Sequence, residues 1–159
     1  MTRSENLCLG HVAPALIDAM VGFRPGGMTY RRTFPGRPDQ VPRARRFIRF
    51  LLEDSSCRDD AEQIVAELAA NAIAHTSSGH SRGTFMVELA RKVTTIRVTV
   101  YDCGWDGTPR FDLPQDVTPL AERGRGLLVV TALATRVGCR GTQAVGHAVW
   151  AELSPISAN

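Results

Sequence analysis

Apolar side chains recur along the chain with two periods, and these periods predict its helices and strands. From Pro38 to Leu52 and from Arg58 to His75 they repeat every three or four residues, which is typical of amphipathic helices. Asp59 and Asp60 suit the first turn of the second helix, where the helix dipole favours anions. A third helix is predicted to begin near Gly126.

Strands are predicted where apolar and polar side chains alternate, or where short apolar runs stand between turn residues. The five segments are Tyr30–Phe34, Phe85–Leu89, Ile96–Val100, Arg136–Cys139 and His147–Leu153, and the second and third form a hairpin. The order β-α-α-β-β-loop-α-β-β predicts an α/β two-layer sandwich. In this fold a mixed, mainly antiparallel sheet is covered on one face by about three helices.

Residues 1–28 are interpreted as an N-terminal appendage, and residues 29–155 as a single domain. Pro25, Gly26 and Gly27 close the appendage as a linker would, and a short helix is expected around Pro14–Val21. Residues 103–123 are rich in Gly, Pro and Asp and indicate a long loop.

The composition is that of an ordinary globular domain. The chain has 159 residues, 43% of them hydrophobic and 22% charged, with a net charge of +3. These values exclude a disordered chain, a collagen-like fibre and a long coiled coil, and they do not favour nucleic acid as a partner. The most apolar N-terminal stretch is too short and too interrupted to span a membrane or to serve as an export signal, so we expect a cytoplasmic protein. The four cysteines lack zinc-ligand spacing and are interpreted as free thiols.

Four arginines lie on the polar faces of the first helix, at positions 43, 45, 46 and 49. They suit either an acidic partner or the solvated face of an amphipathic helix, and we favour the solvated face.

Three clusters place polar residues or glycines where packing alone does not require them. In the first, Glu67, Asn71 and His75 follow an i, i+4, i+8 spacing and form one stripe beside the apolar face of the second helix. A carboxylate can act as a base and an amide oxygen can bind a hard cation. Taken alone, this stripe is more typical of an exposed helix surface than of a functional site.

The second cluster, D-C-G-W-D-G at 102–107, follows a strand, and the third, G-R-G-L-L-V-V at 124–130, opens a helix. An Asp at a strand end leaves its carboxylate available to a ligand amine, although Asp-Gly turns are common. Glycines at a helix start expose backbone N–H groups that favour phosphate. No dinucleotide-binding or P-loop pattern occurs.

Taken together and in this order, E-L-x-x-N-A-x-x-H, D-x-G and G-R-G-L-x-x-V resemble the N, G1 and G2 boxes of the Bergerat-fold (GHKL) ATPases. The closer similarity is to the bacterial anti-sigma-factor serine kinases. Those proteins commonly share the Phe34-Pro35-Gly36 start, a basic first helix and a closing V-W-x-E-L strand, here at 149–153. The resemblance covers residues 30–153, nearly the whole chain.

The resemblance implies ATP and Mg²⁺ as cofactors and assigns roles within the site. Asn71 is the expected Mg²⁺ ligand, Glu67 the general base, and Asp102 the acceptor for the adenine amino group. Arg123 or Arg125 is expected to neutralise charge on the transferred phosphoryl group. The remaining expected nucleotide contacts are His75, Gly104, Gly107, Gly124, Arg125, Gly126 and Leu127.

Two positions depart from the family pattern. The second glycine of the G1 box, Gly107, comes one residue late, and Ala148 stands where relatives often place a threonine that supports the nucleotide-binding aspartate.

The resemblance implies a kinase that phosphorylates a Ser or Thr of an anti-anti-sigma (STAS-type) protein. It also allows a sigma factor as a second partner and a homodimer as the assembly, and the sequence leaves both open. The alternatives are a non-catalytic GHKL module, either nucleotide-sensing or degenerate, that acts by sequestering a partner and, ranked last, a detached histidine-kinase catalytic domain.

Overall fold

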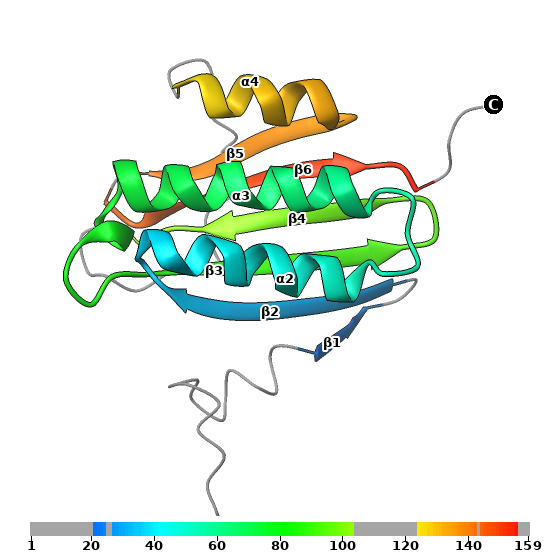
Figure 1. Cartoon of the computed structure of the whole chain (residues 1–159), viewed down its shortest axis with the longest axis horizontal. Helices are drawn as coiled ribbons and strands as arrows, with labels where there is room; N and C mark the ends of the chain where they lie inside the picture. The colour runs from blue at the N-terminus through cyan, green and yellow to red at the C-terminus, as the bar shows by residue number, and fades with distance from the viewer. Residues whose placement is uncertain (1–20, 25–26, 104–123, 143, 156–159) are drawn as a thin grey trace, which may run out of the picture.

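A six-stranded sheet forms the frame of the molecule (Figure 1). The computed structural model describes residues 21–24, 27–103, 124–142 and 144–155. The strand order is β1-β2-β3-β4-β6-β5, and every pairing among the described strands is antiparallel. The strands are β1 Val21–Arg24, β2 Gly27–Pro35, β3 Thr84–Lys92, β4 Ile96–Tyr101, β5 Arg136–Thr142 and β6 Gly146–Leu153.

Strand β1 was not expected from the sequence. It pairs with β2 from Val21↔Tyr30 to Arg24↔Gly27 and lies at the edge of the sheet. It falls within the stretch that the sequence assigns to an appendage, and Val21 belongs to it rather than to a helix. The rest of the expected helix, residues 14–20, lies outside the described residues.

Three α-helices of the described residues, α2 Val41–Leu51, α3 Arg58–His75 and α4 Gly124–Leu133, lie on one face of the sheet (Figure 1). Two short 3-10 helices, η1 Pro38–Gln40 and η2 Ser77–Gly79, flank α2 and α3. The bounds of α3 coincide with those expected, and α4 begins two residues before the expected Gly126. The α/β two-layer sandwich is therefore confirmed.

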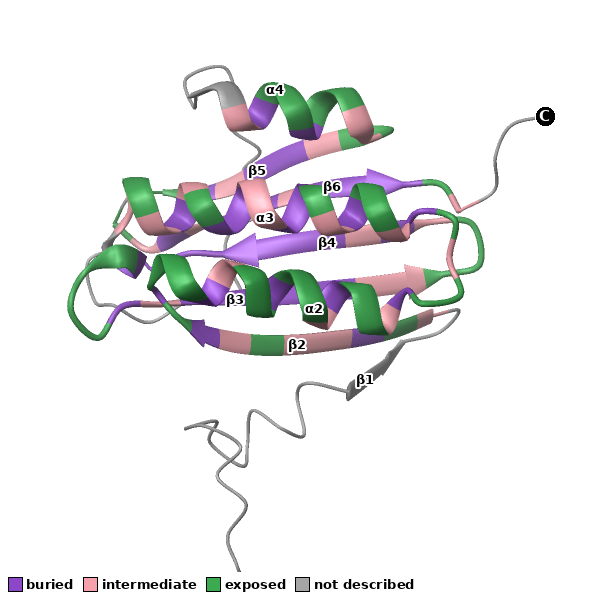
Figure 2. Cartoon of the chain, in the orientation of Figure 1, coloured by how far each residue is buried: buried purple, intermediate pink, exposed green. Residues whose placement is uncertain are grey.

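The main core lies between the helices and the sheet, where the inward faces of both layers are buried (Figure 2). Alternate strand residues such as Val87, Leu89, Val98 and Val100 meet α3 through residues such as Ile64. The intervening residues face the other side of the sheet, where Met86, Tyr101 and Ala148 form a smaller cluster.

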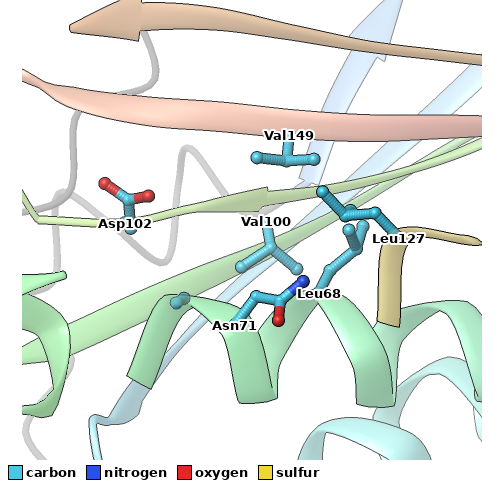
Figure 3. Close-up of a pocket in the computed structure, with 7 residues that line it drawn as sticks. Leu68, Asn71, Val100, Asp102, Leu127 and Val149 are labelled. Carbon is cyan, nitrogen blue, oxygen red and sulfur yellow. The ribbon is translucent and has the colours of Figure 1, made fainter. Parts of the chain in front are cut away.

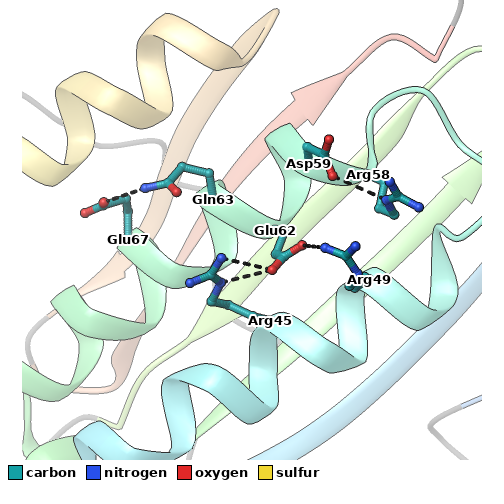
Figure 4. A network of polar contacts seen from close by, with 7 residues as sticks. All are labelled: Arg45, Arg49, Arg58, Asp59, Glu62, Gln63 and Glu67. Atoms are coloured by element: carbon teal, nitrogen blue, oxygen red, sulfur yellow. Dashed lines mark hydrogen bonds and ion pairs between the residues drawn. The ribbon is translucent and has the colours of Figure 1, made fainter.

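The arginines of α2 are exposed, as the favoured interpretation requires. Two of them also join the helices to each other, because Arg45 and Arg49 both pair with Glu62 of α3, at 3.0 and 2.9 Å (Figure 4). Arg43 and Arg46 make no ion pair with the other residues that the structure describes.

Candidate functional site

A pocket lies where α3, α4, β4 and β6 converge (Figure 3). Seven residues line it: Leu68, Asn71, Ala72, Val100, Asp102, Leu127 and Val149. Five of these side chains are apolar, and the other two, Asn71 and Asp102, belong to the first and second polar clusters of the sequence. The third cluster contributes Leu127, so residues far apart in the chain meet at one place.

The apolar walls follow from strand register and helix spacing. Val100 and Val149 are direct cross-strand partners on the helix side of the sheet. Leu68 and Ala72, four residues apart on α3, face them. Apolar side chains from the sheet and from the helix therefore line the pocket from two sides.

Asp102 supplies a buried carboxylate at one end of the pocket and is 2% exposed. Its Oδ1 accepts a hydrogen bond from the backbone N–H of His147 at 2.8 Å, and its own N–H donates to the His147 carbonyl at 2.9 Å. The imidazole of His147 also lies close, with Nδ1 3.4 Å from Asp102 Oδ2. A carboxylate has about four acceptor sites, so it can accept from more than one donor at a time.

The residue that supports Asp102 is therefore His147, the neighbour of Ala148, which stands where relatives often place a threonine for this task. Ala148 pairs with Tyr101, and its side chain packs in the cluster on the opposite face of the sheet. Because side chains alternate between faces, the neighbouring His147 lies on the same side as Asp102.

Asn71 provides an amide that the described fold does not use. The side chain lies in the pocket beside Leu68 and Val100 (Figure 3). Its Nδ2 is buried and has no hydrogen-bond partner among the described residues. Buried amides are normally satisfied, so an unsatisfied one in a pocket indicates a ligand group that it would contact.

Glu67 lies one turn before Asn71 and borders the start of α4. Gln63 donates to its Oε1 at 3.0 Å (Figure 4). A Cβ added at Gly126 would lie 2.7 Å from Glu67 Oε2 and 3.6 Å from the Asn71 amide atoms. The glycine thus lets the backbone of α4 approach both polar side chains of α3.

The start of α4 brings the third sequence cluster to the same place. Gly124 and Arg125 form its first turn, and Leu127 is 5% exposed and closes the pocket. A helix N-terminus with glycines presents backbone N–H groups and favours anions such as phosphate. The side chain of Arg125 lies outside the described part of the structure.

Some expected site residues are not brought to the pocket or cannot be placed. His75 is exposed in the last turn of α3 and does not line the pocket. Gly104, Gly107 and Arg123 lie outside the described residues, as does almost all of the expected loop at 103–123.

The buried amide of Asn71 and the glycines that open α4 suit a phosphate-bearing ligand with a hard cation. Within the described ranges, no group of three or more His, Cys, Asp and Glu residues could hold a metal ion. A cation here would take oxygen ligands from a phosphate-bearing ligand as well as from Asn71, as Mg²⁺ commonly does.

The cavity is small, at about 10 Å³. That volume corresponds to roughly one water molecule. A larger ligand therefore requires Leu127 and the start of α4 to move away from α3.

Comparison with known proteins identifies one domain. The family model described as the histidine kinase-like ATPase domain matches residues 34–153. No curated protein matches the chain. Within the described ranges, none of the helices combines the length and apolar character needed to cross a membrane.

Proposed function

Because the chain belongs to the family of histidine kinase-like ATPase domains, we propose that it binds ATP with Mg²⁺ and transfers the γ-phosphoryl group to a protein serine or threonine. The observation that carries the proposal is the convergence of Asn71, Asp102 and Leu127 on one pocket, with Glu67 at its border. Glu67 and Asn71 come from the first cluster of the sequence, Asp102 from the second and Leu127 from the third.

The pocket suits an adenine ring. Its walls are apolar on both sides, and the Asp102 carboxylate at one end can accept from the exocyclic amino group. The triphosphate would then extend toward the start of α4, where backbone N–H groups and the helix dipole favour negative charge. Leu127 must move outward, because the cavity of about 10 Å³ is too small for a purine.

Asn71 and Glu67 would have different roles in phosphoryl transfer. The amide of Asn71 would hold Mg²⁺, which when bound neutralises charge on the phosphates. Glu67 would accept the proton of the attacking hydroxyl, with Gln63 holding its other oxygen in place. The new bond joins the hydroxyl oxygen to the γ-phosphorus, the bond to the β–γ bridging oxygen breaks, and ADP leaves. Arg123 or Arg125 would neutralise the transferring group.

The partner we propose is an anti-anti-sigma (STAS-type) protein, with a sigma factor as a second partner and a homodimer as the assembly. Helix α2 supports a docking role, because it exposes Arg43, Arg46 and the ring of Phe50, which is 76% exposed. An acidic surface with an apolar contact would complement them.

Two assays test the proposal. Calorimetric titration with ATP, with and without Mg²⁺, should show Mg²⁺-dependent binding that is weakened in Asn71→Ala. Transfer of labelled phosphate to STAS-type proteins of the same genome should be lost in Glu67→Gln, while ATP binding remains.

The matched control for the second assay is Asp60→Asn, which also replaces a carboxylate of α3 by its amide. Asp60 is exposed in the first turn of α3 and does not line the pocket, so transfer should be unchanged. Full transfer by Glu67→Gln would refute the assignment of the base, and absence of nucleotide binding by the wild type would refute the proposed function.

A second function is favoured by the closed state of the pocket. Gly126 packs against Glu67 and Asn71, and the cavity has room for about one water. A module that binds its partner in this closed state and never turns over ATP would act by sequestration. It would bind a partner equally well with and without nucleotide.

A further inference from the structure

The contact between Asp102 and His147 is the closest association of a carboxylate with a histidine among the described residues. The residues face each other across strands β4 and β6, one position beyond the Tyr101↔Ala148 pair. Both backbone N–H groups are used between them, His147 N–H to the Asp102 carboxylate and Asp102 N–H to the His147 carbonyl, at 2.8 and 2.9 Å.

The two side chains are buried together. That of Asp102 is 3% exposed and that of His147 is 13% exposed. His147 Nδ1 lies 3.4 Å from Asp102 Oδ2 and has no hydrogen-bond partner among the described residues. A small rotation of either side chain would bring this nitrogen within ordinary hydrogen-bond distance of the carboxylate, and no other described group satisfies it.

The two carboxylate oxygens of Asp102 face different groups of His147. Oδ1 is held by a backbone N–H, so it is positioned by the sheet itself. Oδ2 is the oxygen that the imidazole faces. A donor at the second oxygen, in addition to the one at the first, helps to fix the plane of the carboxylate.

We propose that His147 is a positioning residue, which donates from Nδ1–H to Oδ2 and so fixes the Asp102 carboxylate for the amino group of an adenine nucleotide. This inference rests on the proposed function. In relatives the nucleotide-binding aspartate is often supported by a threonine hydroxyl at the position of Ala148. Here we assign the support of Asp102 to the imidazole of His147.

The test uses the full chain and compares ADP with IDP, which carries a carbonyl oxygen where adenine has its amino group. His147→Leu removes the donor. His147→Asn keeps a donor at the place of Nδ1. His80→Leu is the matched control, because His80 is exposed and lies outside the pocket. Affinities for both nucleotides are measured by calorimetry, and melting temperatures are recorded for every variant.

We expect His147→Leu to bind ADP at least about tenfold more weakly, because the carboxylate that accepts from the adenine amino group is no longer fixed. The affinity for IDP should change little, because IDP has no amino group for Asp102 to bind. His147→Asn should remain within about threefold of the wild type for ADP. Equal weakening for both nucleotides would mean a general structural role and would overturn the inference.

An unchanged ratio of ADP to IDP affinity in His147→Leu would overturn it as well, while leaving the proposed function intact. Should His147→Leu fail to fold, His147→Ala provides the same comparison. If the wild type binds neither nucleotide, the proposed function fails, and this inference fails with it.

Discussion

Replacing Asp102 by asparagine tests whether this carboxylate reads the base. The side chain is nearly isosteric, so its oxygen can still accept from the His147 N–H that now donates to Oδ1 at 2.8 Å. The amide nitrogen then takes the place of Oδ2 and presents a donor at the pocket in place of an acceptor. The adenine amino group is itself a donor and loses its partner.

The size of the effect follows from the contact that is lost. A hydrogen bond to a charged group contributes about 1.5–3 kcal/mol, which corresponds to roughly 10- to 150-fold weaker binding of ADP. The carbonyl oxygen of IDP can accept from the new amide. A neutral hydrogen bond of about 0.5–1.5 kcal/mol predicts roughly 2- to 10-fold tighter binding of IDP.

Calorimetric titration of both nucleotides into the wild type and Asp102→Asn measures this reversal of preference. The matched control is Asp54→Asn, an exposed aspartate that pairs with Arg91 at 2.8 Å and is remote from the pocket residues. It should leave both affinities unchanged. If Asp102→Asn binds ADP as tightly as the wild type, Asp102 does not read the base and the assigned orientation of the nucleotide is incorrect.

Three further changes have defined outcomes. In Gly36→Ala the new Cβ would lie 1.5 Å from a backbone carbonyl oxygen, so we expect a loss of about 3 kcal/mol and a melting temperature lower by roughly 6–12 °C, measured by circular dichroism. Burial and the charge of Glu88 raise the pKa of Tyr101, so stability that is present below about pH 10 should fall as the pH rises through the folded-state pKa. Tyr101→Phe should reduce this alkaline loss in denaturant titrations. Gly126→Ala displaces the flexible end of Glu67, so phosphoryl transfer should fall about 10- to 100-fold with little change in melting temperature, and normal transfer would contradict the close approach of α4.

The parts of the fold that depend on local patterns were predictable from the sequence. The bounds of α3 follow from its helical spacing, and the β3–β4 hairpin follows from two alternating runs with a short connection. Strand β1 was missed because its four residues show no period of their own and are held only by pairing with β2.

The support of Asp102 by His147 was not predicted, for a related reason. Which residue of β6 faces Asp102 is fixed by the register of two strands that are 45 residues apart in the chain. A shift of one residue moves a side chain to the other face of the sheet, so Ala148 and His147 exchange roles. The order of the three motifs predicted that Asn71, Asp102 and Leu127 share one site. The sequence alone does not give the register between β4 and β6.

The position of β6 inside the sheet has a consequence for biosynthesis. This strand is the last along the described chain, yet it lies between β4 and β5 and supplies one wall of the pocket through Val149. The sheet therefore cannot be completed until the chain has been translated up to residue 153. Until then β4 and β5 each expose an unpaired edge, which makes the nascent chain vulnerable to aggregation and gives chaperones a window in which to bind.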